Sequence, residues 1–293
     1  MKIFEDYDKT LHEIFYLILI VTIAFLFRVY SLSSMDLYFD EVVYTMAARD
    51  LVEHSISPWT LAWQPPLFTW INSISIRLLG LSEFSMRFPT AVFGTLSIFI
   101  IYFLAKIWYG KKYALLAASL LAVSPLSIIY SRVVFSDIIQ TFFLISFIAF
   151  VEYAYHKNID RKQEHIFLIL SGLFFALAFL TKYNSIIFWF TYWIFNLIYA
   201  WHHGKQLLKK YFLYFTISNL VAFLLSLIII IVSGGIPALV YSIFSILFWA
   251  AYQHYLVINP YHYYILVLFD SLSPFLSVIF PIAILSLFFY KKK

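Results

Sequence analysis

The sequence FPTAVFGTLSIFIIYFLAKIW, from Phe88 to Trp108, contains one charged side chain, Lys106. An α-helix of about 20 such residues is long enough to cross the hydrocarbon core of a bilayer. Comparable apolar runs recur along the 293-residue chain, which is 63% hydrophobic and only 12% charged. Too little polar surface remains to cover a soluble domain. The sequence therefore predicts an all-α polytopic membrane protein with a single membrane domain over residues 1–293.

Eight apolar runs are predicted to span the membrane. They cover residues 11–30, 88–108, 113–130, 138–155, 166–180, 185–201, 211–232 and 263–290. The first run lacks a small-residue cleavage site and is longer than a signal-peptide core, so we expect it to be retained. The apolar stretch 238–252 is interpreted as an interfacial or re-entrant helix, because a ninth span would move the lysines at 291–293 to the opposite face.

Basic residues occupy alternate breaks between these runs. They are Lys106, Lys111, Lys112, Lys157, Arg161, Lys162, Lys205, Lys209, Lys210, Lys291, Lys292 and Lys293. By the positive-inside rule they mark the cytoplasmic face, where both termini are expected. The opposite, external face receives the long segment 31–87, the turns 131–137 and 181–184, and the stretch 233–262. Interfacial helices are expected within that long first loop, over residues 41–53 and 67–79.

Metal and nucleophile chemistry is limited by composition. The chain has no cysteine, which excludes disulfides, thiolate metal sites and a cysteine nucleophile. No histidines are spaced as metal ligands: His202 and His203 fall on the predicted cytoplasmic side, and His254 and His262 lie apart in the external stretch. The chain also has no glycine-rich nucleotide loop, and we expect no nucleic-acid partner.

Short motifs follow one another through the predicted external segments. They are YFDEVVY at 38–44, QPPLF at 64–68, SEFSMRFP at 82–89, SPL at 124–126, YSR at 130–132, Asp137, and LTK at 180–182. This succession resembles the GT-C membrane glycosyltransferases of the protein O-mannosyltransferase and aminoarabinose (lipid A) transferase type. The resemblance covers Arg28 to about Trp201. It implies a GT-C-like bundle of about eight transmembrane helices, with a catalytic core in residues 11–201 and variable C-terminal spans in 202–293.

The resemblance also implies a function. Such an enzyme would move a sugar from a polyprenyl- or dolichyl-phosphate to a hydroxyl or phosphate of a protein or glycolipid on the external face, with inversion. A lipid-linked donor also fits the external position of the acids, since nucleotide sugars are cytoplasmic. We expect such a protein in the cell membrane of a prokaryote, in contact with membrane lipid. At 293 residues the chain is short for the family, as a compact member or a piece of a longer protein would be.

The adjacent acids Asp40 and Glu41 carry the central expectation. In the family a carboxylate pair opens the first external loop, and its first member serves as catalytic base or metal anchor. That role falls on Asp40, with Glu41 beside it as a second catalytic residue. A partly desolvated carboxylate has a raised pKa and can take the proton of an acceptor hydroxyl. The alternative for Asp40 is an N-cap of the interfacial helix 41–53.

Asp137 is the second candidate acid. The family places an acid here that faces the first across a cavity, which makes Asp137 a candidate catalytic residue. Together Asp40 and Asp137 could hold one divalent cation through carboxylate oxygens. Asp137 could instead bind the acceptor, or cap the helix that begins at Ile138.

Four polar residues are candidates for binding the donor phosphate. Arg87, Arg132 and Lys182 could supply positive charge where the leaving phosphate becomes negative. Each could instead reach to lipid headgroups or pair with a nearby acid. Gln64 precedes the Pro65-Pro66 pair, where related enzymes often carry histidine or a charged residue, so it offers hydrogen bonds without charge.

A different class of function stays open. The alternatives are a transporter or flippase for lipid-linked sugars and an inactive accessory subunit. Transporters tend to carry intramembrane charge. Asp270, with Pro274 and Pro281 in the last apolar run, is the clearest deep charge. Transporters are often built from two repeated halves, and the sequence contains no convincing internal repeat.

Overall fold

The computed structural model describes residues 2–34, 36–59, 64–155, 159–237 and 240, with side chains from residue 11 onward. The chain divides into two compact units, 1–242 and 243–293, and all the described residues belong to the first. Within them the helices are α1 (Lys2–Val29), α2 (Phe39–Glu53), α3 (Leu67–Leu79), α4 (Glu83–Tyr109), α5 (Lys111–Val123), α6 (Pro125–Tyr130), α7 (Ser136–Tyr155), α8 (Arg161–Thr181), α9 (Ser185–His203) and α10 (Lys205–Val232). No strand occurs in the described ranges, which confirms the all-α prediction.

Five of these helices are long and apolar enough to cross a membrane: α1 from Leu11, α4, α7, α8 and α10. They lie where the sequence predicts spans, and the chain is an integral membrane protein. The predicted single span 113–130 is instead two helices, α5 and α6, that meet at Ser124. Pro125 begins α6, because proline has no N–H to continue α5 but fits the first turn of a helix. Helix α9 occupies the predicted span 185–201, whereas 263–290 and 238–252 lie outside the described residues, so eight spans remain a prediction.

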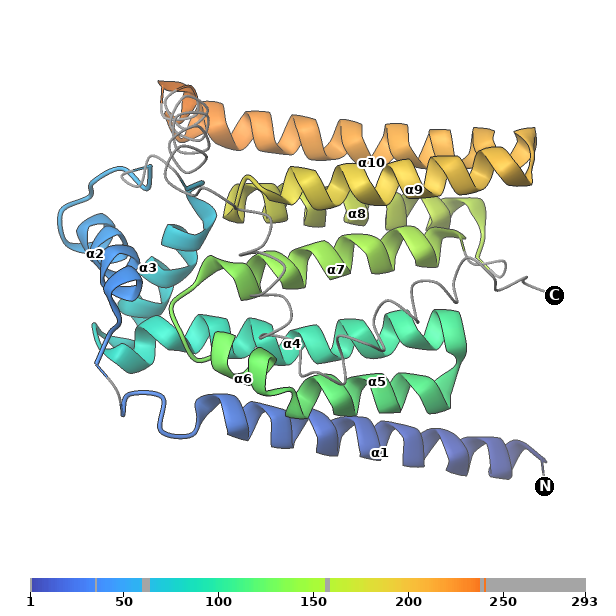
Figure 1. The fold of residues 1–293 in the computed structure, drawn as a ribbon, viewed down its shortest axis with the longest axis horizontal. Coiled ribbons are helices and arrows are strands. Elements are labelled where there is room, and N and C mark those ends of the chain that lie inside the picture. Colours follow the sequence, from blue (N-terminus) through green and yellow to red (C-terminus); the bar gives the residue numbers. More distant parts are fainter. Residues whose placement is uncertain (1, 35, 60–63, 156–158, 238–239, 241–293) are drawn as a thin grey trace, which may run out of the picture. The chain divides into compact units, whose positions relative to one another are not determined.

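Helices joined by a short turn, such as α4 and α5, α7 and α8, or α9 and α10, run in opposite directions and pack side by side (Figure 1). Helix α7 packs on α4 and α8, and α8 packs on α10. The α8–α10 contact is close because Gly172 has no side chain: a Cβ there would lie 2.5 Å from the Ser218 carbonyl oxygen. Beside it, the hydroxyl of Ser171 donates a hydrogen bond of 2.9 Å to that of Ser218. Buried aromatic residues, among them Phe147 and Trp193, fill the core between α7, α8 and α9.

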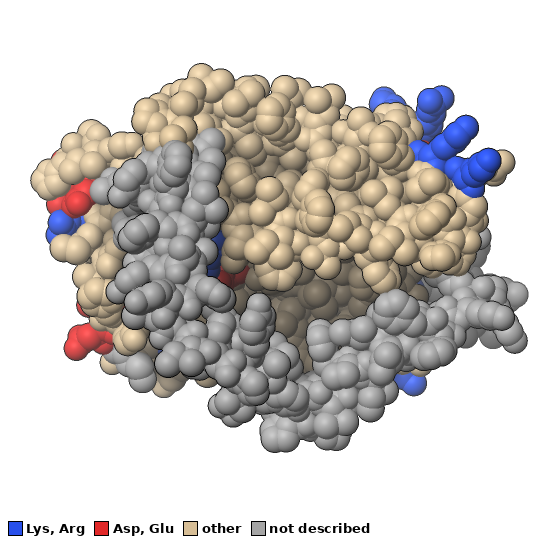
Figure 2. Space-filling model, turned by 45° about the horizontal axis from the view of Figure 1, so that its top comes forward, with Lys and Arg blue, Asp and Glu red and all other residues tan. Residues whose placement is uncertain are grey.

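The interfacial helices α2 and α3 are confirmed in the long first loop. They contact each other, and α3 contacts α4 and α8. We call the end of the described bundle that holds them the α2 end. Lys and Arg side chains gather mainly at the opposite end, where α5, α8 and α10 begin, and the face in Figure 2 shows Asp and Glu side chains at the α2 end. Other acids, among them Glu13 and Glu164, pair with lysines at the opposite end. The described basic breaks, at 106–112, 161–162 and 205–210, therefore share one end, as expected. Lys157 and residues 291–293 lie outside the described residues, and the assignment of that end to the cytoplasm stays a prediction.

Arg28 joins three helices near the α2 end. Its side chain is fully buried and donates hydrogen bonds to the carbonyls of Ala24, Leu121 and Ala122, and to the hydroxyls of Ser127 and Ser131. The Leu121 and Ala122 carbonyls belong to the last turn of α5, where free carbonyl oxygens and the helix dipole favour a positive charge. Arg28 is therefore a structural residue that fixes α1 against α5 and α6.

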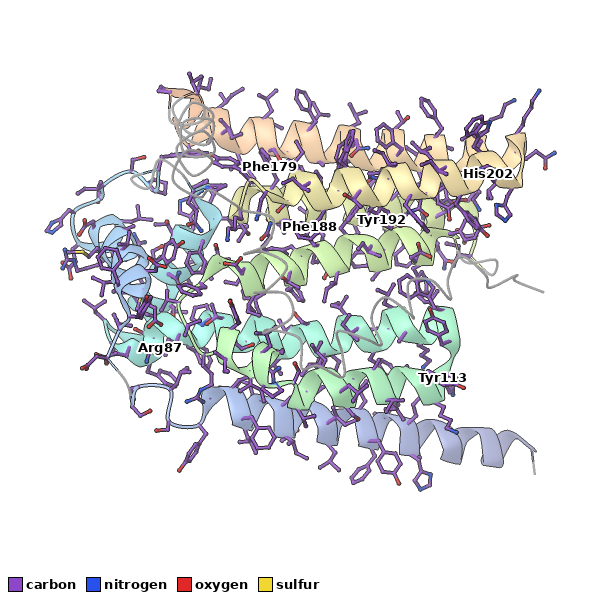
Figure 3. All side chains as sticks on the ribbon, viewed as in Figure 1. Arg87, Tyr113, Phe179, Phe188, Tyr192 and His202 are labelled. Atoms are coloured by element: carbon purple, nitrogen blue, oxygen red, sulfur yellow. The ribbon has the colours of Figure 1, made fainter. Side chains whose placement is uncertain are left out.

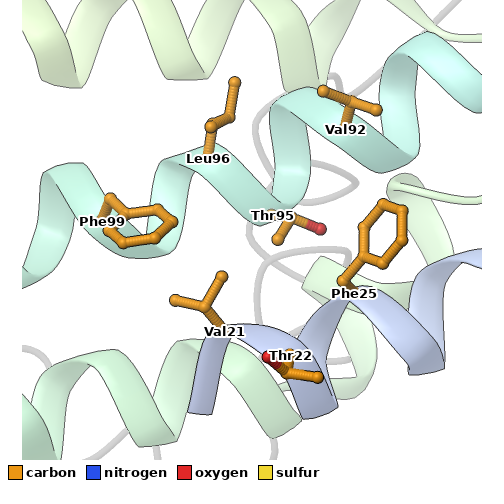
Figure 4. A pocket seen from close by; sticks show the side chains of 7 residues that line it. All are labelled: Val21, Thr22, Phe25, Val92, Thr95, Leu96 and Phe99. Carbon is orange, nitrogen blue, oxygen red and sulfur yellow. The ribbon is translucent and has the colours of Figure 1, made fainter. Parts of the chain in front are cut away.

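Helix α1 otherwise packs loosely. Between α1 and α4 lies an apolar cavity of about 330 Å³ (Figure 4). Its walls are Val21, Thr22, Phe25, Val92, Thr95, Leu96 and Phe99. No charged side chain lines it, so it offers no group that could take part in proton transfer or hold a phosphate.

Candidate active site

The two adjacent acids of the first loop differ in environment. Helix α2 begins at Phe39, with Tyr38 at its N-cap, so Asp40 is not the N-cap residue. Asp40 is exposed, and among the residues that the structure describes it forms no hydrogen bond or ion pair. Glu41, by contrast, is only 1% exposed. One peptide unit of a helix turns neighbouring side chains about 100° apart, which sends one acid out and one in.

Glu41 forms a buried ion pair with Arg87 at the start of α4. Figure 3 labels Arg87 at the α2 end. The Arg87 Nε donates to Glu41 Oε1 at 2.9 Å, and one terminal nitrogen donates to Oε2 at 2.8 Å. The backbone amides of Val134 and Tyr38 complete the shell, at 2.8 Å and 2.9 Å. Glu41 thereby joins α2, α4 and the α6–α7 loop through one carboxylate.

These donors determine the charge state of Glu41. Burial alone would raise its pKa, but the hydrogen bonds from Arg87, Tyr38 and Val134 outweigh burial and lower the pKa below the ordinary 4.5. Glu41 is therefore an anion at neutral pH, and its oxygens are occupied. A carboxylate in this state is poorly placed to accept a further proton from a substrate.

Arg87 also holds the chain that leads into α2. Its second terminal nitrogen donates to the Leu32 carbonyl, and the nitrogen that bonds Glu41 Oε2 also donates to the Asp36 carbonyl, each at 3.0 Å. Because the guanidinium is 4% exposed and already serves a carboxylate and two carbonyls, it acts here as an anchor for the first loop. The predicted contact of Arg87 with a donor phosphate stays a prediction.

Asp137 and Lys182 form the second ion pair of the α2 end. Asp137 lies in the first turn of α7, and its Oδ1 is 2.8 Å from the Nζ of Lys182. The side chain of Asp137 is 46% exposed and that of Lys182 is 34% exposed, so both are accessible to a ligand. Lys182 follows the last residue of α8 with an extended backbone, φ −158° and ψ 126°, which ends the helix there.

A cavity of about 350 Å³ extends from Asp137 between α4, α5, α6 and α7. Most of its wall is apolar. Hydroxyl groups also line it, from Ser97, Ser124, Ser127, Tyr130 and Thr141. An apolar cavity with a carboxylate at one end suits a molecule that has an apolar part and a polar group.

Tyr44 lies near both candidate aspartates, Asp40 and Asp137. It lies one helical turn after Asp40 on α2 and packs edge to face on Phe68, with ring centroids 5.1 Å apart. Burial, then the charges of Asp137 and Asp40, raise the pKa of Tyr44 to about 12. Both carboxylates therefore lie near one phenol that stays protonated at neutral pH and can donate a hydrogen bond.

Arg132 and Gln64 make local contacts. The Arg132 guanidinium donates to backbone carbonyls at the end of α1, including that of Tyr30 at 2.6 Å, where it compensates the helix dipole. Gln64 is 4% exposed and donates from Nε2 to the Thr181 carbonyl at 3.5 Å, beside Lys182. The structure thus brings Gln64, Lys182 and Asp137 into one neighbourhood, while Arg132 serves α1. Their predicted roles in donor binding stay predictions.

No group of three or more His, Asp or Glu side chains in the described ranges could hold a metal ion. The predicted metal pair, Asp40 and Asp137, would supply two carboxylates. A magnesium ion can use one or two carboxylates together with substrate phosphate, so the metal role stays a prediction.

The sequence reading did not single out Tyr44 or Gln140. Gln140 is 4% exposed and donates to Asn184 and Ser185 at the start of α9. A signal for each was present: Tyr44 follows Asp40 by four residues and Gln140 follows Asp137 by three, and both spacings put the pair on one helix face.

The comparisons with known proteins agree on one group. A family model described as dolichyl-phosphate-mannose-protein mannosyltransferase matches residues 63–234. Undecaprenyl phosphate-alpha-4-amino-4-deoxy-L-arabinose arabinosyl transferase of Wigglesworthia glossinidia brevipalpis is 28% identical over 186 residues, which are 60% of this chain and 32% of that protein. The chain spans between 10% and 32% of the length of the first curated relatives that it matches.

Two solved structures have a similar fold. ArnT from Cupriavidus metallidurans, bound to undecaprenyl phosphate, matches with a TM-score of 0.65 at 19% identity over 76% of this chain and 42% of that one. The archaeal oligosaccharyltransferase AglB from Archaeoglobus fulgidus, in complex with an inhibitory peptide and a dolichol-phosphate, matches with a TM-score of 0.64 at 16% identity, over 96% and 37%. At these identities the likeness concerns the fold.

Proposed function

This chain belongs to the dolichyl-phosphate-mannose-protein mannosyltransferase family, within the GT-C superfamily, and we propose that it transfers a sugar from a lipid phosphate at its α2 end. The donor would be a polyprenyl- or dolichyl-phosphate sugar. This class is suggested by the undecaprenyl phosphate and dolichol-phosphate named for the two similar structures. The acceptor would be a hydroxyl or phosphate of a protein or glycolipid on the external face of the membrane.

The observation that carries the proposal is the contrast between Asp40 and Glu41. Glu41 is buried, ionised and fully hydrogen-bonded, and it ties α2 to Arg87 and to Val134. Asp40 is held one residue away on the same rigid helix, exposed and without a hydrogen-bond or ion-pair partner among the described residues. A base must be free to accept a proton, and rigid support keeps it in reach of its substrate. We therefore assign Asp40 as the base.

The proposed reaction is a displacement at the anomeric carbon. Asp40 takes the proton of the acceptor hydroxyl while that oxygen forms a bond to the anomeric carbon. The bond from this carbon to the phosphate oxygen breaks on the opposite face, its electron pair leaves with the lipid phosphate, and the configuration inverts. Lys182 is the proposed cation for the leaving phosphate, because its side chain is 34% exposed and, among the described residues, its ammonium pairs with Asp137 alone.

Glu41 and Arg87 take part indirectly in this proposal. Their contacts support a positioning role for the loop that carries Asp40, in place of the direct catalytic and phosphate-binding roles expected from the sequence. Asp137 would hold Lys182 toward the site and line the cavity that receives part of a substrate. The Tyr44 hydroxyl would donate to a substrate oxygen between the two aspartates.

Sugar transfer by the purified protein in lipid nanodiscs tests the proposal. A panel of polyprenyl-phosphate sugars, hexoses and pentoses, is offered with peptide and lipid acceptors, and products are detected by mass spectrometry. The parent should form product, and Asp40→Asn should lose at least about 100-fold of the rate, at the low end of what a general base contributes. Asp50→Asn is the matched control, because it removes the same charge from the same helix.

Three outcomes would contradict parts of the proposal. Equal product from the parent and Asp40→Asn would remove Asp40 as the base. Equal loss in Asp40→Asn and Asp50→Asn would point to the net charge of α2. Donor binding by the parent without product, over long incubation and with every acceptor, would favour a transporter or an inactive subunit.

A further inference from the structure

We propose that Gln140 is a positioning residue that sets the Lys182–Asp137 pair by holding the turn between α8 and α9. The inference rests on the proposed function only where it concerns sugar transfer. Gln140 lies on α7 one turn after Asp137, so both side chains leave α7 on the same face. Each of them contacts the same short turn, residues 182–185.

Gln140 is well suited to hold that turn. Its side chain is 4% exposed, and its Nε2 donates to Asn184 Oδ1 at 2.5 Å and to Ser185 Oγ at 2.7 Å. The two hydrogens of one amide group thus meet two successive residues of the turn. A buried amide with both donors used is costly to disrupt, because a partner left behind in apolar surroundings remains unpaired.

The contact extends from Ser185 to Lys182. The Ser185 hydroxyl lies 2.8 Å from the carbonyl oxygens of Lys182 and Ala178 and can donate its proton to either. The Ser185 amide also donates to the Lys182 carbonyl, at 3.1 Å. Gln140 therefore fixes the backbone of Lys182 through Ser185, and Asp137 receives the Lys182 ammonium.

Freedom in this turn would separate the ion pair. Lys182 has a long, flexible side chain that is partly exposed, so water can solvate its ammonium in positions away from Asp137. The Gln140 contacts restrict the backbone of the turn 182–185, from which the Lys182 side chain extends. In the proposed reaction, this restriction would keep the Lys182 ammonium where negative charge develops on the phosphate. A displaced ammonium would lower the rate of transfer.

A cross-linking experiment tests the positioning without requiring activity. A water-soluble carbodiimide joins a lysine amine and a carboxylate in contact, and mass spectrometry reports the yield of the Asp137–Lys182 amide. We expect Gln140→Met, which keeps the volume but removes both donors, to lower this yield about fivefold, the effect of a coupling near 1 kcal/mol. The Glu13–Lys111 pair, 2.8 Å apart at the opposite end, is the internal reference and should keep its yield.

A second variant guards against a folding defect. Asn184→Ala removes one acceptor of the Gln140 amide at an exposed position, and it should lower the same yield. An unchanged Asp137–Lys182 yield in both variants would overturn the inference. A parallel fall in the Glu13–Lys111 yield would also overturn it, since the effect would then be general loosening of the fold.

Activity separates this inference from the function. In transfer assays, Gln140→Met should lower kcat about 10- to 100-fold with little change in KM, as expected for a misplaced group. The same substitution in a Lys182→Met background should add almost nothing, because the effect passes through Lys182. A full additional loss there would contradict the route through Lys182. Normal cross-linking in a parent that transfers no sugar would refute the proposed function and leave the positioning intact.

Discussion

The carboxylate of Glu41 is enclosed by four donors, two from the guanidinium of Arg87 and one each from the amides of Val134 and Tyr38. These donors come from three separate parts of the chain: the segment before α2, the start of α4 and the α6–α7 loop. The ion pair therefore does more than neutralise a charge: it fixes the start of α2 against α4 and the α6–α7 loop. These contacts also fix the position of the neighbouring, exposed Asp40 on α2.

Breaking this ion pair from either side should destabilise the protein strongly. Glu41→Gln or Arg87→Met leaves a buried charge without its partner, which costs about 3–5 kcal/mol. The double variant should cost less than the sum of the two, because neither charge then remains. Unfolding titrations in mixed micelles measure these values.

The exposed Arg49–Asp50 pair on α2 is the control for that measurement. Its side chains keep 35% and 25% of their exposure, so Asp50→Asn should cost no more than about 1 kcal/mol. Strictly additive losses in the double variant would mean that Glu41 and Arg87 do not stabilise the fold as a pair.

Acid should weaken the fold through Glu41. Its pKa is lowered in the folded protein, so as the pH falls below the ordinary 4.5 the unfolded chain takes up the proton first. The stability from this group is fully present above pH 4.5 and is lost as the pH falls through the lowered folded-state pKa. Unfolding at a series of pH values should show a steeper acid loss for the parent than for Glu41→Gln; equal slopes would contradict the assignment.

Arg28→Met should destabilise the protein by about 1–3 kcal/mol, because the Ala122 carbonyl at the end of α5 loses a buried donor that comes from α1. The same change at the exposed Arg77 on α3 should stay within about 0.5 kcal/mol. The unfolding titrations described above compare the two variants. Similar values for both would show that the buried contacts of Arg28 carry little stability.

Gly172→Ala should separate α8 from α10. The new methyl group would meet the Ser218 carbonyl at 2.5 Å and the Val221 Cβ at 2.7 Å, and a backbone atom cannot move aside cheaply. Overpacking of this kind costs about 1–3 kcal/mol. Ser171→Ala, the neighbouring position, adds no atom but loses the hydroxyl contacts with Ser218 and the Leu168 carbonyl, and should cost about 1 kcal/mol. A smaller loss for Gly172→Ala than for Ser171→Ala would contradict this packing.

Much of this molecule could be predicted from the order of its residues. Apolar runs, basic breaks and the motifs around Asp40 and Asp137 predict a helical membrane protein, its family and one end that holds the acids. These features are local or compositional, because a bilayer demands long apolar helices whatever their neighbours are. The break at Pro125 was readable in principle but was masked by the continuous apolar pattern on either side.

Only the tertiary structure decided how the charged residues are used. Glu41 and Arg87 are 46 residues apart in sequence, and Asp137 and Lys182 are 45 apart, so no local pattern relates them. Once the helices pack, burial forces each charge either to find a partner or to remain at the surface. That requirement made anchors of Glu41, Arg87, Arg28 and Arg132, and it left Asp40 exposed and without a partner among the described residues.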